Sequence, residues 1–193
     1  MFRTLLAAAP AVLLSATAMA EPVNYEFDKT HTVIRASWDH QGYATMSMEF
    51  TNYDGTLALD FDEPSNSTVD VTFNIEGGFW VGANQDAFIG HLNSADLFNT
   101  EAFPTARFVA TGFETEDGVT GTMTGDLTLL GNTGPVSLDV TLNRTGENRN
   151  GAVKRGFTAT GTILRSQWNM GYAVPFVSDE IEIYIGTELE AVE

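Results

Sequence analysis

Residues 125–140 read GDLTLLGNTGPVSLDV, two apolar runs on either side of a polar turn. The apolar side chains fall on every second residue, which is the period of a β-strand with one buried face. The alternating positions are Leu127, Leu129, Val136, Leu138 and Val140. Asn132, Gly134 and Pro135 favour a chain reversal between the runs, because glycine tolerates positive φ and proline cannot continue a hydrogen-bonded ladder. The stretch predicts a β-hairpin whose inner face covers something apolar.

The same two-residue period recurs along most of the chain after Glu21. The further alternating runs are residues 34–40, 46–50, 57–61, 69–75, 157–163 and 181–185. Turn signals separate the runs, and Asp117-Gly118 predicts a tight hairpin turn. The total is about eight strands, a pattern typical of an all-β sandwich or barrel.

One segment, ANQDAFIGHLNSADLFN at residues 83–99, departs from this pattern. Phe88, Leu92 and Ala95 are spaced i, i+4 and i+7, which is helical spacing. The sequence therefore predicts one short helical insertion in an antiparallel eight-stranded chain, acting as a lid or plug at the mouth of a barrel.

The first 20 residues have the features of a signal peptide. Arg3 precedes an apolar run, and Ala18-Met19-Ala20 places small residues where signal peptidase reads the chain. Pro10 interrupts the run, which is shorter than the ~20 apolar residues of a membrane span. We predict cleavage after Ala20, export to a bacterial periplasm, and one soluble domain over residues 21–193 that is not an integral membrane protein.

The charge balance is strongly acidic, with 26 Asp and Glu residues against 9 Lys and Arg residues and a net charge of −17. Such a surface repels phosphate backbones at long range, so nucleic acid is not expected as a partner. The acidity favours solubility.

The sequence holds few candidates for catalysis. It contains no cysteine, no GxSxG nucleophile motif and no phosphate-binding glycine loop. His31, His40 and His91 fall in different predicted elements, without metal-ligand spacing on one strand or helix. A site built from Asp39, His40 and His91 would require the fold to gather them. We expect no catalytic residue, no metal and no cofactor.

The apolar side chains are more informative, because many of them are large. Among them are Trp38, Met46, Met48, Phe50, Phe79, Trp80, Phe88, Phe98, Phe108, Trp168, Met170 and Tyr172. The interior of a closed eight-stranded barrel is either just filled by side chains or wide enough for one small ligand. The residues alone leave both interpretations open.

Several motifs in order point to one family. In YEFDKTHTVIRASWDHQGY (25–43) the matching positions are Asp28, His31, Thr32, His40 and Gly42, and in MEFTNYDGTL (48–57) they are Phe50, Tyr53, Asp54 and Gly55. In HLNSADLFNTEAFPTARF (91–108) they are His91, Leu92, Ser94, Asp96, Leu97, Phe98, Pro104 and Phe108. The hairpin supplies Gly125, Leu127, Thr128, Gly131, Thr133, Pro135 and Val136, and Arg165, Trp168 and Met170 follow. Through these blocks the chain resembles the YceI-like periplasmic proteins, which look like extended lipocalins and are described as binding polyisoprenoids.

The resemblance implies a fold and a function. The fold would be a single eight-stranded antiparallel lipocalin-like barrel, and residues 21–193 would form the YceI-like domain, as a monomer or a homodimer. Its function would be periplasmic binding, storage or transport of an isoprenoid lipid, either an isoprenoid quinone or a polyprenyl phosphate, in an apolar tunnel. From strand parity and the family's tunnel we expect the ligand contacts to be Ile34, Trp38, Met46, Met48, Phe50, Phe88, Leu92, Phe98, Phe108, Leu127, Leu129, Trp168 and Met170.

The chain also departs from the family pattern. Phe88-Ile89 stands where the family often has Arg-Asp, Gly134 replaces a lysine, and Met48 replaces a common glycine. If the missing charges hold a polar headgroup, this chain prefers a neutral one, as in an isoprenoid quinone.

Two alternatives remain beside lipid binding. In the first, His40 and His91 form an acid–base or metal pair in a lipid-modifying enzyme. In the second, a solid barrel core supports a stress-related or interaction protein that works through its acidic surface.

Overall fold

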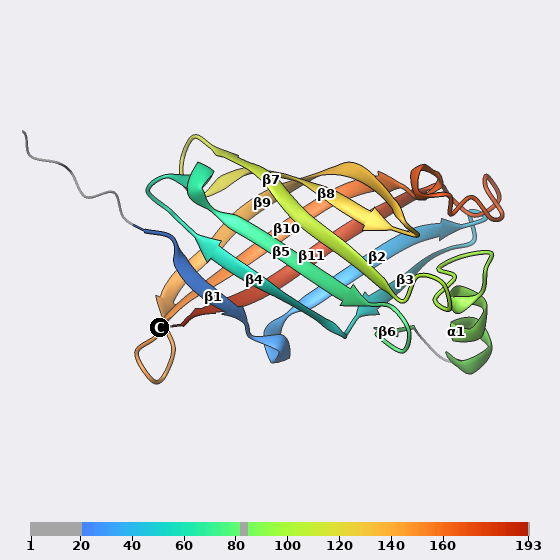
Figure 1. Ribbon diagram of the computed structural model, residues 1–193, viewed down its shortest axis with the longest axis horizontal. Coiled ribbons are helices and arrows are strands. Elements are labelled where there is room, and N and C mark those ends of the chain that lie inside the picture. Colours follow the sequence, from blue (N-terminus) through green and yellow to red (C-terminus); the bar gives the residue numbers. More distant parts are fainter. Residues whose placement is uncertain (1–20, 82–84, 193) are drawn as a thin grey trace, which may run out of the picture.

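The computed structural model describes residues 21–81 and 85–192 (Figure 1). The predicted signal peptide, residues 1–20, lies outside the described residues. The strands are β1 (Val23–Phe27), β2 (Val33–His40), β3 (Ala44–Phe50), β4 (Tyr53–Leu59), β5 (Thr68–Asn74), β6 (Phe79–Trp80), β7 (Thr105–Thr115), β8 (Thr120–Leu129), β9 (Asn132–Glu147), β10 (Val153–Leu164) and β11 (Glu180–Ala191). Helix α1 spans Gln85–Asn93, and short 3₁₀ turns are η1 (Lys29–His31), η2 (Pro64–Asn66) and η3 (Arg165–Trp168).

The strands close into a barrel. Hydrogen-bonded neighbours follow the order β1-β4-β5-β7-β8-β9-β10-β11, and β1 pairs with β11 to complete the ring. Strands β2, β3 and β6 extend the sheet beyond β11. Strand β11 pairs with β1 near Leu189 and with β2 near Ile185, so β1 and β2 are two halves of one long strand interrupted by η1. The predicted antiparallel eight-stranded barrel with a helical insertion is therefore confirmed.

The barrel has two distinct ends (Figure 1). At the helix end lie α1, the turn between β2 and β3, and the loop of residues 165–179 between β10 and β11. At the C-terminal end lie the start of β1, the end of β11, the β7–β8 turn and the β9–β10 loop.

The hairpin of residues 125–140 has the predicted inner face but a different turn. Strands β8 and β9 are joined by only Leu130 and Gly131, both with positive φ (50° and 71°). Two central residues with positive φ match the twist of the strands they join. The predicted turn residues Asn132, Gly134 and Pro135 lie inside β9, with Pro135 opposite Asp126. The chain reversal is thus tighter than its polar residues indicated.

The helical segment is shorter than the pattern of residues 83–99 predicts. Helix α1 ends at Asn93, and the hydroxyl of Ser94 donates to the carbonyl of His91 at 2.7 Å as the chain turns away. The N–H of Phe98 returns to donate to the carbonyl of Leu92 at 2.9 Å. Leu92 and Phe98 are buried in one apolar cluster with Trp38. Residues 82–84 lie outside the described residues.

A polar cluster stabilises the interruption between β1 and β2. Asp28 caps η1, where its Oδ1 accepts the N–H of Thr30 at 3.1 Å. Its Oδ2 lies 2.7 Å from Nδ1 of His31 and 2.9 Å from Nζ of Lys154, which also pairs with Glu188. The hydroxyl of Thr30, then Lys154 and His31, hold the pKa of Asp28 well below its ordinary value.

Replacing Asp28 by asparagine is expected to lower the free energy of unfolding at neutral pH by about 1–2 kcal/mol, since a helical cap and a charged hydrogen bond are weakened together. The folded pKa of this carboxyl lies below its unfolded value of about 4, so its stabilisation is present above that pH and is lost as the pH falls through the folded pKa. Urea unfolding of both proteins across a pH series should therefore show their difference shrinking in acid. A difference that stays constant down to the acid limit of folding would contradict this assignment.

Candidate functional site

A cavity of about 1050 Å³ occupies the inside of the barrel. Its wall consists of the inward-facing side chains, which are every second residue along each strand. In β11, for example, Ile181, Ile183 and Ile185 all face the cavity. The lining extends from Phe61 near the C-terminal end to Tyr172 at the helix end. Because most of the lining side chains are apolar, the cavity suits a long apolar molecule rather than a polar one.

All but one of the predicted ligand contacts line this cavity. They are Ile34, Trp38, Met46, Met48, Phe50, Phe88, Leu92, Phe98, Phe108, Leu127, Leu129 and Met170. The strand residues reach the cavity through the predicted alternation, and Phe88 and Leu92 reach it from α1. The structure thus brings these side chains together around one space, and their contact with a ligand stays a prediction.

Trp168 is the exception, because it is not among the lining residues. Its side chain is buried at 1 % exposure, and its indole N–H donates to the carbonyl of Leu127 at 2.9 Å. The ring lies where a side chain on Gly134 would be: a Cβ there would sit 3.1 Å from the tryptophan Cζ2. Gly134 therefore makes room for the tryptophan, whose role in this structure is packing.

The cavity wall also includes residues that are not among the predicted ligand contacts. The hairpin residues Val136, Leu138 and Val140 line the cavity, as expected for the predicted inner face. Other residues follow the same parity and could have been named as ligand contacts: Phe157, Ala159, Ile163, Ile181, Ile183 and Ile185. Phe113 could not, because a bulge between Ala110 and Gly112 shifts the register of β7. Tyr172 and Val177 come from the loop of residues 165–179, where no periodicity applies.

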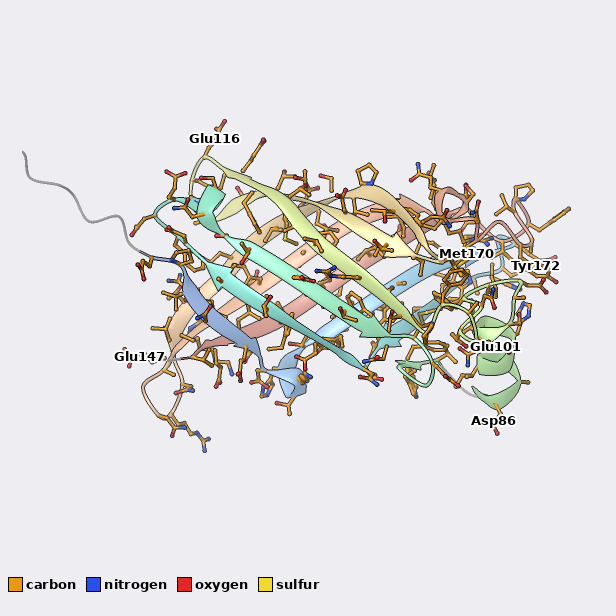
Figure 2. The ribbon with its side chains drawn as sticks, viewed as in Figure 1. Asp86, Glu101, Glu116, Glu147, Met170 and Tyr172 are labelled. Carbon is orange, nitrogen blue, oxygen red and sulfur yellow. The ribbon has the colours of Figure 1, made fainter. Side chains whose placement is uncertain are left out.

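Polar groups gather at the helix end of the cavity. His40, Gln41, His91 and Tyr172 line it there, and the rings of His91 and Tyr172 meet edge to face at 5.3 Å between centroids. Figure 2 shows Tyr172 beside Met170 at this end, above α1.

Arg165 organises this end of the barrel. Its guanidinium donates to the carbonyls of Met170 (2.6 Å), Tyr172 (2.9 Å), Val177 (3.0 Å) and Ser178 (2.8 Å). The residue is buried at 5 % exposure, and burial lowers the pKa of the guanidinium, with the nearby Asp179 acting in the opposite direction. Arg165 therefore closes the loop of residues 165–179 into one fixed shape.

Polar side chains also line the C-terminal end of the cavity, and the buried one among them, Asp60, is already hydrogen-bonded. Others are Ser67, Glu114, Thr115, Thr120 and Thr122. Asp60 is buried and lines the cavity, but its carboxylate accepts the N–H groups of Glu63 (2.8 Å) and Asp62 (3.0 Å) and the side-chain amide of Asn66 (3.1 Å). These bonds, that of Glu63 first, lower its pKa. Asp60 thus shapes the β4–β5 loop as an ionised cap.

Over residues 21–81 and 85–192, one group of potential metal ligands comes together: Asp28, His31 and Glu188, with ligand atoms within 4.8 Å of one another. The ammonium group of Lys154 contacts both carboxylates. Since this ammonium already supplies the positive charge, the cluster has no need of a metal ion. His40 and His91 are not part of such a group in the described part of the chain.

Within the same described ranges, no helix is long and apolar enough to cross a membrane. The fold and the cavity together define a closed antiparallel β-barrel with a long apolar binding space.

The sequence matches the YceI-like domain over residues 25–189, and the chain belongs to that family. A relative, the UPF0312 protein ECA1782 of Pectobacterium atrosepticum, is 34% identical over 188 residues, covering 96% of both chains.

Solved structures share the fold. BcnA of Burkholderia cenocepacia superposes with a TM-score of 0.74 at 20% identity, over 84% of this chain and 99% of that one. A polyisoprenoid binding domain from Saccharophagus degradans, implicated in plant cell wall breakdown, gives a TM-score of 0.62 at 12% identity, over 88% and 99%. At these identities the likeness establishes the barrel architecture.

Proposed function

We propose that this chain binds an isoprenoid lipid inside its barrel and stores or carries it in the periplasm. The observation that supports this most is the cavity, whose volume of about 1050 Å³ is lined mainly by apolar side chains. Pockets for small ligands measure roughly 300–1,000 Å³, so this one accommodates a large ligand. The name of the Saccharophagus domain adds a polyisoprenoid-binding example with the same fold.

Burial of the tail would supply the binding energy. Each methylene taken out of water contributes ~0.8 kcal/mol, so an isoprene unit contributes up to about 4 kcal/mol before the costs of association. Met46 and Met48 on the cavity wall can adapt to the branched chain, because methionine is unbranched and flexible. The length of the cavity would then select the length of the tail.

We further propose a neutral headgroup, as in an isoprenoid quinone. Phe88 lines the cavity and lies against Trp38, with 6.4 Å between ring centroids, and Ile89 packs against the same apolar cluster. The charged pair that the family often has at these positions is thus replaced by apolar side chains, which provide no charge and no hydrogen-bond donor for a phosphate.

A Phe88→Arg/Ile89→Asp variant is expected to shift the preference from quinone toward polyprenyl phosphate by about tenfold, or ~1.4 kcal/mol. Competition between the two lipids for the purified protein measures this preference. A Phe88→Leu/Ile89→Val variant, which keeps the site apolar, is the matched control and should bind like the parent. An unchanged preference in the charged variant would refute the neutral-headgroup proposal.

We also propose that the protein binds its lipid without modifying it. His40 and His91 both line the helix end, yet His91 packs on Tyr172 and His40 pairs through its backbone with Val177. A His40→Gln/His91→Gln variant should leave lipid uptake unchanged, and the bound lipid should leave both proteins with its mass unaltered. A lipid product formed by the parent and absent from the variant would favour the enzyme alternative.

Mass spectrometry of organic extracts tests the proposal as a whole. The protein is purified from its own periplasm without detergent, beside a mock purification. We expect a mature chain beginning at Glu21 and an isoprenoid enriched at a near-equal molar ratio. An empty extract, from protein that also refuses added isoprenoids, would overturn lipid binding. Recovery of the chain from the cytoplasm alone would overturn export.

A further inference from the structure

The loop at the helix end differs in charge from the rest of this acidic chain. Residues 166–178, SQWNMGYAVPFVS, contain no Asp, Glu, Lys or Arg, although the chain has 26 acidic residues. The loop nevertheless exposes large apolar groups: Phe176 is 74 % exposed and Tyr172 is 50 % exposed. Tyr43, in the uncharged turn between β2 and β3, is 87 % exposed.

These three side chains belong to one surface, called here the aromatic rim: Tyr43, Tyr172 and Phe176. The N–H of Ser178 donates to the carbonyl of Asp39 at 3.1 Å, and Val177 pairs with His40, so the loop lies along the turn that carries Tyr43. Tyr172 also lines the cavity, so the rim adjoins the helix end of the binding space.

The rim is held in place by the folded structure. The guanidinium of Arg165 donates to the carbonyls of Tyr172 and Val177, on both sides of Phe176. The exposure of Phe176 therefore belongs to a fixed loop conformation. Clustered apolar groups that a fold keeps in water mark a surface for a partner.

The opposite end of the barrel exposes Val119 (50 %) at the cavity, but among acidic residues. Its β7–β8 turn carries Glu116 and Asp117, and its β4–β5 loop carries Asp62 and Glu63. Figure 2 shows Glu116 and Glu147 projecting at that end, far from Tyr172. Within the described part of the chain, the exposed aromatic surface and the uncharged loop thus coincide at the helix end, where Asp86 of α1 and Glu101 also lie (Figure 2).

We propose that the aromatic rim docks on the surface of a lipid bilayer with zwitterionic headgroups, which places the helix end of the cavity against the membrane. Tyrosine suits this position because its ring is apolar and its hydroxyl is wet. A lipid tail that moves between the bilayer and the cavity would then stay out of water. This transfer rests on the proposed lipid function. The net charge of −17 disfavours anionic headgroups.

Site-specific labelling tests the orientation directly. The chain has no cysteine, so Phe176→Cys provides a single attachment point for an environment-sensitive fluorophore, and Val153→Cys provides a control at the C-terminal end. With phosphatidylcholine vesicles the label at 176 should shift to the blue while the label at 153 stays unchanged. Equal shifts, or none, would overturn the docking proposal. A shift at 176 that follows protein concentration without vesicles would overturn it in favour of self-association.

Vesicle flotation measures the contribution of the rim. A Tyr43→Ser/Phe176→Ser variant should partition to phosphatidylcholine vesicles about tenfold less than the parent, and a Val23→Ser/Val153→Ser variant should partition like it. Added phosphatidylglycerol should weaken flotation of the parent. Equal flotation of the rim variant and the parent would refute the proposal.

A second readout separates the two proposals. Neither Tyr43 nor Phe176 lines the cavity, so uptake of a short isoprenol from water should be the same in the rim variant and the parent. If the parent takes up the isoprenol but does not float with the vesicles, the docking proposal is refuted and the lipid function is not. Absence of uptake by the parent would refute the lipid function itself.

Discussion

Replacing Arg165 by alanine is expected to lower the free energy of unfolding by about 3–5 kcal/mol, because a buried charged group and its bonds to several carbonyls are lost together. The guanidinium makes hydrogen bonds to Met170, Tyr172, Val177 and Ser178 at 2.6–3.0 Å. Without it, the carbonyl of Met170, whose residue is only 7 % exposed, would lose a partner that water cannot easily replace. Denaturant unfolding of parent and variant measures the difference.

The matched control is Arg165→Lys, which keeps the charge but has no planar fork of donors. It should recover only part of the lost stability, since one ammonium cannot reach carbonyls on both sides of the loop. The loosened loop should also weaken isoprenoid binding, because Met170 and Tyr172 line the cavity. An alanine variant that loses less than about 1 kcal/mol would show that water satisfies these carbonyls and that Arg165 does not hold the loop.

The strands and most of the cavity wall could be predicted because a two-residue period specifies a face directly. Once Leu127 is placed inside, its partner on β7, Phe108, lies on the same inner face. Met46, Met48 and Phe50 lie inside for the same reason. The face that each of these side chains takes thus follows from the local pattern.

The remaining features depend on contacts that the pattern does not contain. The turn at Leu130 uses positive φ in a residue that rarely adopts it, and the bulge near Gly112 moves Phe113 to the inner face. Trp168 packs over Gly134 because a glycine on the strand leaves space for an indole, a pairing of residues far apart in sequence. The loop of residues 165–179 is held by Arg165 and has no period at all. Tertiary contacts determine these positions.

Replacing Ala159 by phenylalanine is expected to shorten the binding space. Ala159 lies in β10 between Val140 on β9 and Ile185 on β11, and all three line the cavity. A ring at this position would project into the middle of the barrel. Each isoprene unit kept out of the cavity forfeits up to about 4 kcal/mol, so affinity for a long-chain isoprenoid should fall by more than about 100-fold. A short-chain isoprenoid that fills the cavity on only one side of residue 159 should bind the variant with the affinity of the parent.

The comparison between chain lengths makes this prediction independent of general damage to the protein. Thr160→Phe adds the same ring to the adjacent, exposed position and should change neither affinity. Because the added ring enters a cavity, Ala159→Phe should keep the stability of the parent, whereas in a barrel filled by its own side chains it would cost about 1–3 kcal/mol through overpacking. Unfolding and binding measured on the same two variants therefore discriminate between a cavity that measures isoprenoid length and the solid core of the interaction-protein alternative. Loss of stability with unchanged chain-length preference would support the solid core and refute the tunnel.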